Sequence, residues 1–272
     1  MGIDWQLFES GPAEAEHTVL LLPGGMCSAR SYLELAQQPS MSALRLVAAT
    51  MPGQAGAPSP DGYSPEAYGR LTAELAAEKG ADVVVGFSMG ANVALEMVEK
   101  GLFTGPTVLL GISLSLADES AFFISLIRMS HVLGPVPLAL MKKGVGSMVK
   151  KIPVSPDRQA ELAADFRRND TRDMRLALGE YLKWLRSGED HAAMLCRSGV
   201  PTWVVHAEKG DGGLTDPERR TLEACSTVRI VTIPGSVFFL PNEVPDQIAA
   251  VITEAVAAAN THRSPTRDVA ET

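Results

Sequence analysis

The sequence predicts an α/β fold with a mostly parallel, doubly wound β-sheet that is covered by helices on both faces. Strands that are apolar throughout are buried on both faces, and their alternation with helices is typical of parallel sheets. Helical stretches such as PEAYGRLTAELAAEKG and ANVALEMVEKG have apolar residues at helical spacing and end in glycine. The expected strands lie in TVLLLPGG, ADVVVGFSMG, GPTVLLGIS, VPTWVVHAE and TVRIVTIPG.

This alternation stops between about Ser113 and His191, where four helical stretches follow one another without a strand pattern. We therefore expect residues 113–191 to form a helical lid, inserted into a core domain made of residues 1–112 and 192–260. The polar end of the chain, residues 261–272, is expected to be disordered.

The composition is that of a globular protein, with 46% hydrophobic and 21% charged residues among 272. A net charge of −8 argues against nucleic acid as a partner. Cys27, Cys196 and Cys225 are too widely spaced to indicate a metal site or a disulfide framework. The chain start does not resemble a signal peptide, and no apolar run approaches the roughly 20 residues of a membrane span. We expect a cytoplasmic protein without metal, cofactor or membrane contact.

The segment Gly86-Phe87-Ser88-Met89-Gly90 has the G-x-S-x-G pattern of a nucleophile elbow. It follows an apolar strand and precedes a helix, which is the setting that the elbow requires. Glycines two before and two after the serine are needed because the turn is too tight for side chains there. The pattern predicts that Ser88 is a nucleophile at the amino end of a helix, where a developing anion is stabilised.

With this elbow, the chain resembles the α/β-hydrolase superfamily over nearly its whole length outside the lid and the tail. Leu22-Pro23-Gly24-Gly25-Met26 stands where that family has its oxyanion turn, with proline in place of the usual histidine. Met51-Pro52-Gly53-Gln54-Ala55-Gly56 is similar to the family's Pro-Gly-x-Gly segment, although Thr50 replaces the customary aspartate. The resemblance implies that the backbone N–H groups of Gly25 and Met89 bind the oxyanion.

The same resemblance places the acid of a catalytic triad after a late strand, in the segment VPTWVVHAEKGDGGLTDPER. Asp211 lies nearest the expected position, although an aspartate there can also simply close a turn. Asp216 is the alternative acid, but Thr215-Asp216-Pro217-Glu218 has the residues of a helix start.

The histidine of the triad is missing. In the family it lies in a Pro-Gly-x-x-His-Phe loop after the last strand, whereas this chain has Pro234-Gly235-Ser236-Val237-Phe238-Phe239. Phe238 therefore occupies the position of the base, and phenylalanine cannot take a proton from Ser88. The loss of a triad base in a serine hydrolase costs on the order of 10⁶ in turnover.

Five histidines are present, and each has a structural interpretation beside a catalytic one. His17 and His262 are expected to face solvent, and His131 and His191 border the lid and could reach over the elbow. His206 ends the strand that leads to Asp211 and is the best candidate for a replacement base, although a hydrogen-bonded strand-end histidine is the simpler interpretation. Cys27 could be a second nucleophile, but a small buried thiol is the usual case.

The lid and the elbow region are rich in apolar and polarisable side chains, which favours a pocket for a hydrophobic small molecule. Four lysines, Lys142, Lys143, Lys150 and Lys151, form a basic patch that is either a solvated face or a contact for an anionic ligand or an anionic membrane surface. The residues expected to line the pocket are Met26, Phe87, Phe122, Phe123, Met129 and Met141.

These features lead to more than one functional hypothesis. The first is an atypical serine hydrolase, similar to esterases and thioesterases, that acts slowly on a hydrophobic small molecule. The alternatives are a non-hydrolytic enzyme of the same fold, of the cyclase or lyase type, and a non-catalytic protein that binds a hydrophobic ligand. A further interpretation is that Phe238 was introduced to disable an enzyme. Retention of Ser88 and the glycines around it favours an enzyme, because a binding protein has less need of a strained turn.

Overall fold

The computed structural model describes residues 3–209 and 213–263, in which seven strands form one sheet of order β1-β3-β2-β4-β5-β6-β7. Strand β1 pairs antiparallel with β3, and the remaining neighbours are parallel. The strands are β1 (Leu7–Ser10), β2 (Thr18–Leu22), β3 (Arg45–Ala49), β4 (Val83–Phe87), β5 (Thr107–Leu110), β6 (Thr202–Lys209) and β7 (Val228–Ser236).

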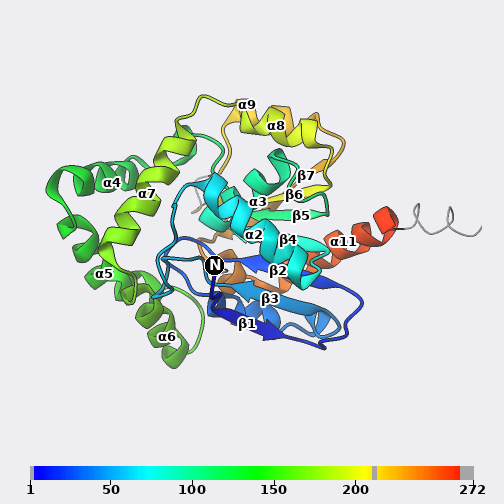
Figure 1. Ribbon diagram of the computed structural model, residues 1–272, viewed down its shortest axis with the longest axis horizontal. Helices are drawn as coiled ribbons and strands as arrows, with labels where there is room; N and C mark the ends of the chain where they lie inside the picture. Colours follow the sequence, from blue (N-terminus) through cyan, green and yellow to red (C-terminus); the bar gives the residue numbers. More distant parts are fainter. Residues whose placement is uncertain (1–2, 210–212, 264–272) are drawn as a thin grey trace, which may run out of the picture.

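Helices cover both faces of the sheet, as the apolar strands require (Figure 1). Alternate residues of β2 enter two different cores, with Leu20 and Leu22 in one and Val19 and Leu21 in the other. The first core contains residues of α2 (Pro65–Lys79), α3 (Met89–Glu99), α8 (His191–Ser198) and α9 (Asp216–Glu223), and the second those of α1 (Leu33–Ala36), α10 (Leu240–Glu243) and α11 (Pro245–Arg263).

The prediction of an α/β fold with a mostly parallel sheet is confirmed. The five expected strands are present as β2, β4, β5, β6 and β7, and α2 ends at Gly80 with a left-handed φ of +64°. Strands β1 and β3 were not expected because LFES and RLVAA are short and carry polar or small residues rather than a continuous β-branched run. No helix of the described ranges is both long and apolar enough to cross a bilayer.

Between β5 and α8 in the chain lie the four helices α4 (Ala121–Leu133), α5 (Val136–Val149), α6 (Pro156–Arg167) and α7 (Thr171–Leu185). They gather on one side of the molecule, at the left of Figure 1, whereas α11 ends on the opposite side. We call them the helical insertion. Helix α11 continues to Arg263, three residues into the segment expected to be disordered, because AAANTHR contains no helix breaker. Residues 264–272 of that segment lie outside the described ranges.

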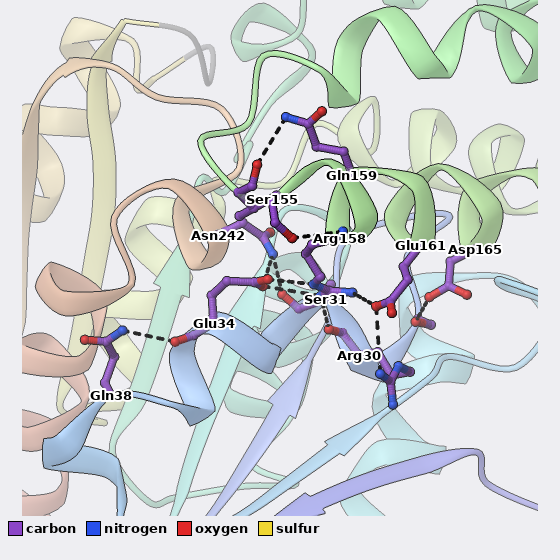
Figure 2. A network of polar contacts seen from close by, with 12 residues as sticks. Arg30, Ser31, Glu34, Gln38, Ser155, Arg158, Gln159, Glu161, Asp165 and Asn242 are labelled. Atoms are coloured by element: carbon purple, nitrogen blue, oxygen red, sulfur yellow. Dashed lines mark hydrogen bonds and ion pairs between the residues drawn. The ribbon is translucent and has the colours of Figure 1, made fainter.

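A polar clasp joins the helical insertion to the core domain (Figure 2). The buried guanidinium of Arg158, on α6, bonds through Nε to Glu34 Oε1 at 2.6 Å and through a terminal nitrogen to the Arg30 carbonyl at 2.5 Å. Asn242 on α10 donates to the other oxygen of Glu34 at 2.7 Å and to the Ser31 carbonyl at 2.8 Å. The clasp therefore connects α6, α1 and the helix that directly follows Phe239.

Candidate active site

Ser88 occupies a strained turn between β4 and α3. Its φ of +49° and ψ of −120° lie outside the ordinary regions for an L-residue, and its N–H donates to the Leu110 carbonyl at 2.8 Å. A Cβ on Gly86 would lie 2.3 Å from the Gly90 oxygen, and a Cβ on Gly90 would lie 2.2 Å from the Leu22 oxygen. Both positions therefore require glycine, and the half-buried Ser88 is held at the amino end of α3.

The glycine-rich turn after β2 lies directly against this elbow. A Cβ on Gly24 would be 3.5 Å from Ser88 Cβ, and one on Gly25 would be 3.5 Å from Met89 Sδ and 3.6 Å from Met89 Cβ. The structure thus brings together Gly25, Met89 and Ser88, the three residues that the sequence singled out for oxyanion binding and nucleophilic attack. These distances are those of ordinary van der Waals contact, so the turn packs directly against the start of α3.

Two side-chain amides that the sequence analysis did not single out hold this turn in place. Met26 has a left-handed φ of +69°, and its N–H donates to Gln54 Oε1 at 2.8 Å. The Met26 carbonyl accepts from Asn169 Nδ2 at 2.8 Å, and Asn169 Oδ1 accepts from the Ala55 N–H at 2.7 Å. Asn169 follows α6, so the helical insertion braces the turn directly. The one sequence feature that could have pointed to Gln54 as a functional residue is its position inside the Pro-Gly-x-Gly segment.

A cavity of about 550 Å³ opens over Ser88, between the sheet domain and the helical insertion. Its volume is that of a small-molecule site. Five of the six residues expected to line it do so, and Ser88, Gly25, Met89 and Phe238 line it as well. The lining residues from the expected set are Met26, Phe87, Phe122, Phe123 and Met141.

Met129 is the exception among the expected lining residues. It is 46% exposed and does not contribute to the cavity wall. Met129 lies seven residues after Phe122 on α4, so the two share a helix face but are separated by about 10 Å along the axis. The cavity ends before the second half of α4, and Met129 lies beyond it.

One end of the cavity is polar, which the sequence did not predict. Glu119 Oε1 accepts hydrogen bonds from Ser113 Oγ at 2.8 Å and from the Tyr181 hydroxyl at 2.5 Å, and all three residues line the cavity. Burial, reinforced by the Glu119 charge, raises the pKa of Tyr181 well above its ordinary value. The phenol is therefore a neutral hydrogen-bond donor at neutral pH. A ligand that reaches this end meets a carboxylate acceptor.

Phe238 lies in the cavity wall, at the position that the sequence assigned to the missing base. Its side chain is 49% exposed, and its N–H donates to Glu243 Oε1 at 3.0 Å. The ring meets Phe239 edge-on with centroids 4.9 Å apart, and Phe239 in turn lies 6.3 Å from Phe87. This part of the wall is therefore aromatic, and none of its three phenylalanine side chains can exchange a proton with Ser88.

None of the histidines whose side chains are described lines the cavity. His131 lies over Gly179 on the outside of α7, and so does not reach over the elbow as considered from the sequence. His191 is buried on α8, where it stacks on Trp184 at 3.8 Å between ring centroids and bonds to Glu99 at 3.0 Å. His206 is buried within β6 beside Thr232 of β7, and His17 is buried at 3.5 Å from Asp82 rather than facing solvent as expected.

The acid predicted at Asp211 lies outside the described residues. Asp216 is the exposed first residue of α9, where Thr215 and Glu218 form a capping box, so its position matches the helix start that the sequence indicated. Glu208, at the end of β6, was not considered from the sequence. Its carboxylate accepts the Gly235 N–H at 2.8 Å and so lies beside the loop that carries Phe238.

Cys27 lines the cavity but is poorly suited to act as a nucleophile. Burial, together with the nearby Asp165 carboxylate, raises the pKa of its thiol to about 12. The thiolate fraction near pH 7 is therefore negligible. Within residues 3–209 and 213–263, no group of three or more His, Cys, Asp or Glu side chains is arranged to hold a metal ion.

Comparison with known proteins agrees with this fold. The sequence model of the alpha/beta hydrolase family matches residues 19–251. The chain belongs to the alpha/beta hydrolase family. Comparison with curated protein sequences gives no match.

Solved structures of this fold are similar to the chain at low sequence identity. A thioesterase domain from the curacin biosynthetic pathway is 17% identical, with a TM-score of 0.68 over 93% of this chain and 100% of that one. A thermophilic esterase from Thermogutta terrifontis is 16% identical, with a TM-score of 0.66 over 94% of both chains. At this level of identity the likeness concerns the fold.

Proposed function

We propose that the chain is an atypical serine hydrolase, of the esterase or thioesterase type, that acts on a hydrophobic small molecule without a triad histidine. The observation that carries this proposal is the position of Ser88. It is held at a strained φ of +49° under an apolar cavity, beside Gly25 and Met89. Such strain persists where the surrounding structure maintains it for a function.

The chemistry that fits this arrangement is attack on an acyl carbonyl. With the carbonyl oxygen against the N–H groups of Gly25 and Met89, negative charge that develops on it is stabilised by fixed donors and by the amino end of α3. One such donor is typically worth about 3 kcal/mol in the barrier. The apolar walls bind the acyl or alcohol part, and the Glu119 end accepts a hydrogen bond from a polar group of the ligand.

The rate is expected to be low because no histidine of the described residues lines the cavity to serve as base for the Ser88 hydroxyl. Phe238 supplies none, and the described histidines lie outside the cavity wall. Water or the leaving group of an activated ester must accept the proton instead. An enzyme of this kind turns over activated esters slowly and ordinary esters hardly at all.

The second candidate function is binding without hydrolysis, or a reaction of the same fold that needs no acyl-enzyme. The observation that favours it is the aromatic wall of Phe238, Phe239 and Phe87, which provides contact area where a hydrolase has its base. Under this alternative, Ser88→Ala leaves ligand affinity and turnover unchanged.

The two functions are separated by hydrolysis of p-nitrophenyl esters of short and long acyl chains, with Ser88→Ala and Cys27→Ala measured beside the native protein. Slow turnover that Ser88→Ala abolishes and Cys27→Ala preserves supports the hydrolase. Turnover that is insensitive to Ser88→Ala, or absent while the esters still bind, contradicts it. Thermal unfolding of each variant shows that the fold is intact.

A further inference from the structure

Positive charge is concentrated on the hairpin of α4 and α5. Residues 120–156 carry five basic side chains and no carboxylate, although the whole chain has a net charge of −8, so the remaining residues carry −13. No ion pair joins any of the five to a carboxylate of the described residues, and Lys142 alone has a side-chain hydrogen bond, to the Asn169 carbonyl. The five are Arg128, Lys142, Lys143, Lys150 and Lys151.

The same hairpin carries most of the large apolar side chains that face solvent. Val132 is 84% exposed and Phe122 is 78% exposed, and Leu133 and Val136 flank the turn between the two helices. A soluble surface seldom gathers such side chains in one place without a partner. Seven of the ten exposed large apolar residues of the described chain lie here: Phe122, Met129, Val132, Leu133, Val136, Leu140 and Met148.

Along α5, exposed apolar residues come first, next to the turn, and lysines follow farther along the helix. Val136, Leu140, Lys143 and Lys150 are spaced i, i+4, i+7 and i+14, so they share one helix face. The apolar pair lies next to the turn, and Lys150 follows Leu140 by about 15 Å along the axis. In a bilayer, the anionic headgroups lie outside the hydrocarbon region. An apolar hairpin tip can therefore reach the edge of the hydrocarbon while lysines farther from the tip lie at the level of the headgroups.

The exposed patch is continuous with the cavity over Ser88. Phe122 and Met148 are exposed to solvent and also line the cavity, so they lie at its mouth. The hairpin stands on the side of the molecule away from the end of α11 (Figure 1). Any partner surface that contacts the exposed side of the hairpin therefore also contacts the mouth of the cavity.

We propose that the α4–α5 hairpin docks the protein onto an anionic lipid bilayer, with Leu133 and Val136 in the interface and Lys143 and Lys150 at the headgroups. A bilayer fits better than a second copy of this chain, because the described residues outside the hairpin offer only Leu102, Leu176 and Phe238 as exposed large apolar side chains to cover the tip. It also fits better than an acidic protein, because the apolar residues surround the end of a hairpin rather than line a groove.

The proposal is tested by sedimentation of the full chain with vesicles of phosphatidylcholine alone and of phosphatidylcholine mixed with phosphatidylglycerol. We expect binding to the anionic vesicles that weakens as salt is added. Lys143→Glu with Lys150→Glu should lower the partition coefficient by at least roughly 25-fold, about fivefold for each lysine removed, because the added carboxylates are also repelled by the headgroups. Leu133→Glu with Val136→Glu should lower it at least tenfold. Neither variant alters the residues around Ser88.

The matched controls are Leu102→Glu, an exposed apolar residue just beyond the far end of α3, and Arg197→Glu, an exposed basic residue on α8. Both should partition within about twofold of the native protein, and so should Ser88→Ala, because docking does not depend on catalysis. Failure to bind anionic vesicles, or equal binding by the hairpin variants and the controls, overturns the proposal. The proposal is also overturned if the native protein does not bind vesicles but is a dimer in light scattering, and the hairpin variants are monomers.

Discussion

The backbone N–H of Met26 donates to the side-chain oxygen of Gln54 at 2.8 Å, and this bond holds a left-handed residue next to Gly25. The bond holds the peptide between Gly25 and Met26 in place, and we therefore expect Gln54 to help position the neighbouring Gly25 N–H. Asn169 holds the carbonyl of the same residue from the other side. The cost of a positive φ at methionine, on the order of 1 kcal/mol, is offset by these contacts.

Gln54→Leu should therefore misplace the Gly25 donor. The variant leaves the Met26 N–H without its acceptor, which costs about 1–3 kcal/mol of unfolding free energy. Ser88-dependent ester turnover should fall at least tenfold. Denaturant unfolding and p-nitrophenyl ester kinetics measure the two effects. Gln37→Leu, at an exposed position, is the control, and an equal response of both variants would show that Gln54 has no special role.

Gly86→Ala tests the geometry of the elbow. The added Cβ would lie 2.3 Å from the Gly90 oxygen and 2.6 Å from Ala91 Cα, both of them backbone atoms that cannot move independently. We expect a loss of more than about 3 kcal/mol in unfolding free energy, or failure to fold.

The control for Gly86 is Gly144→Ala, in the interior of α5, where a Cβ meets nothing within 4 Å. That change should stabilise the protein by roughly 0.5–1 kcal/mol, since alanine is the better helix former. A Gly86→Ala protein as stable as the native one would contradict the geometry of the turn.

Asp118→Asn should change the pH dependence of stability. Burial raises the pKa of Asp118 from its usual 3.8 to about 6, and the neighbouring Glu218 adds to the shift. A carboxyl group whose pKa is higher in the folded state than in the unfolded chain stabilises the folded state fully at pH values below its unfolded pKa. This contribution is lost as the pH rises through about 6. The unfolding free energy of the native protein relative to Asp118→Asn should therefore fall between pH 4 and pH 7.

Urea unfolding across this range measures the effect. Asparagine preserves an acceptor for the N–H groups of Leu114 and Ser115, so the loop itself should persist. Hydrogen bonds from Thr215 lower the pKa of Glu218 despite its burial, so that group contributes only at the acidic end of the range. Asp157→Asn, on the exposed start of α6, is the control, and parallel profiles for native protein and Asp118→Asn would refute the shift.

Arg158→Met should loosen the helical insertion from the core domain. The substitution retains the aliphatic stem but leaves Glu34 without its cation, a loss on the order of 3 kcal/mol for a buried pair. Thermal unfolding measures the loss of stability, and limited proteolysis between α5 and α7 measures the loosening of the helical insertion. Arg167→Met, exposed on the same helix, should have little effect. Adding Glu34→Gln to Arg158→Met should restore part of the stability, because the unpaired charge is then removed.

The fold and the elbow could be predicted from the sequence because local sterics dictate them. Gly86 and Gly90 are required by carbonyl oxygens within the same turn and the adjacent strand, and continuous apolar strands can only be buried on both faces. Phe238 was recognisable for a different reason, because the loop from Pro234 to Phe239 matches the family's Pro-Gly-x-x-His-Phe pattern at the positions around it.

Contacts between distant segments could not be predicted in this way. Asn169 reaches a turn more than a hundred residues earlier in the chain, and Glu119 becomes part of the cavity only when Tyr181 of α7 folds over it. Apolar spacing placed Phe122 and Met129 on one face of α4 but gave no information on where the cavity ends along the helix. Asp211 remains a prediction, since it lies outside the described residues.

The most direct test of the central claim is Ser88-dependent ester hydrolysis by Phe238→His, with Phe238→His combined with Ser88→Ala as the matched control. The side chain at this position already lines the cavity with Ser88, so an imidazole there can act as the base. We predict a gain in turnover of about 10²-fold or more over the native protein, abolished in the double variant. No gain in a folded Phe238→His protein, or a gain that survives Ser88→Ala, would contradict the account.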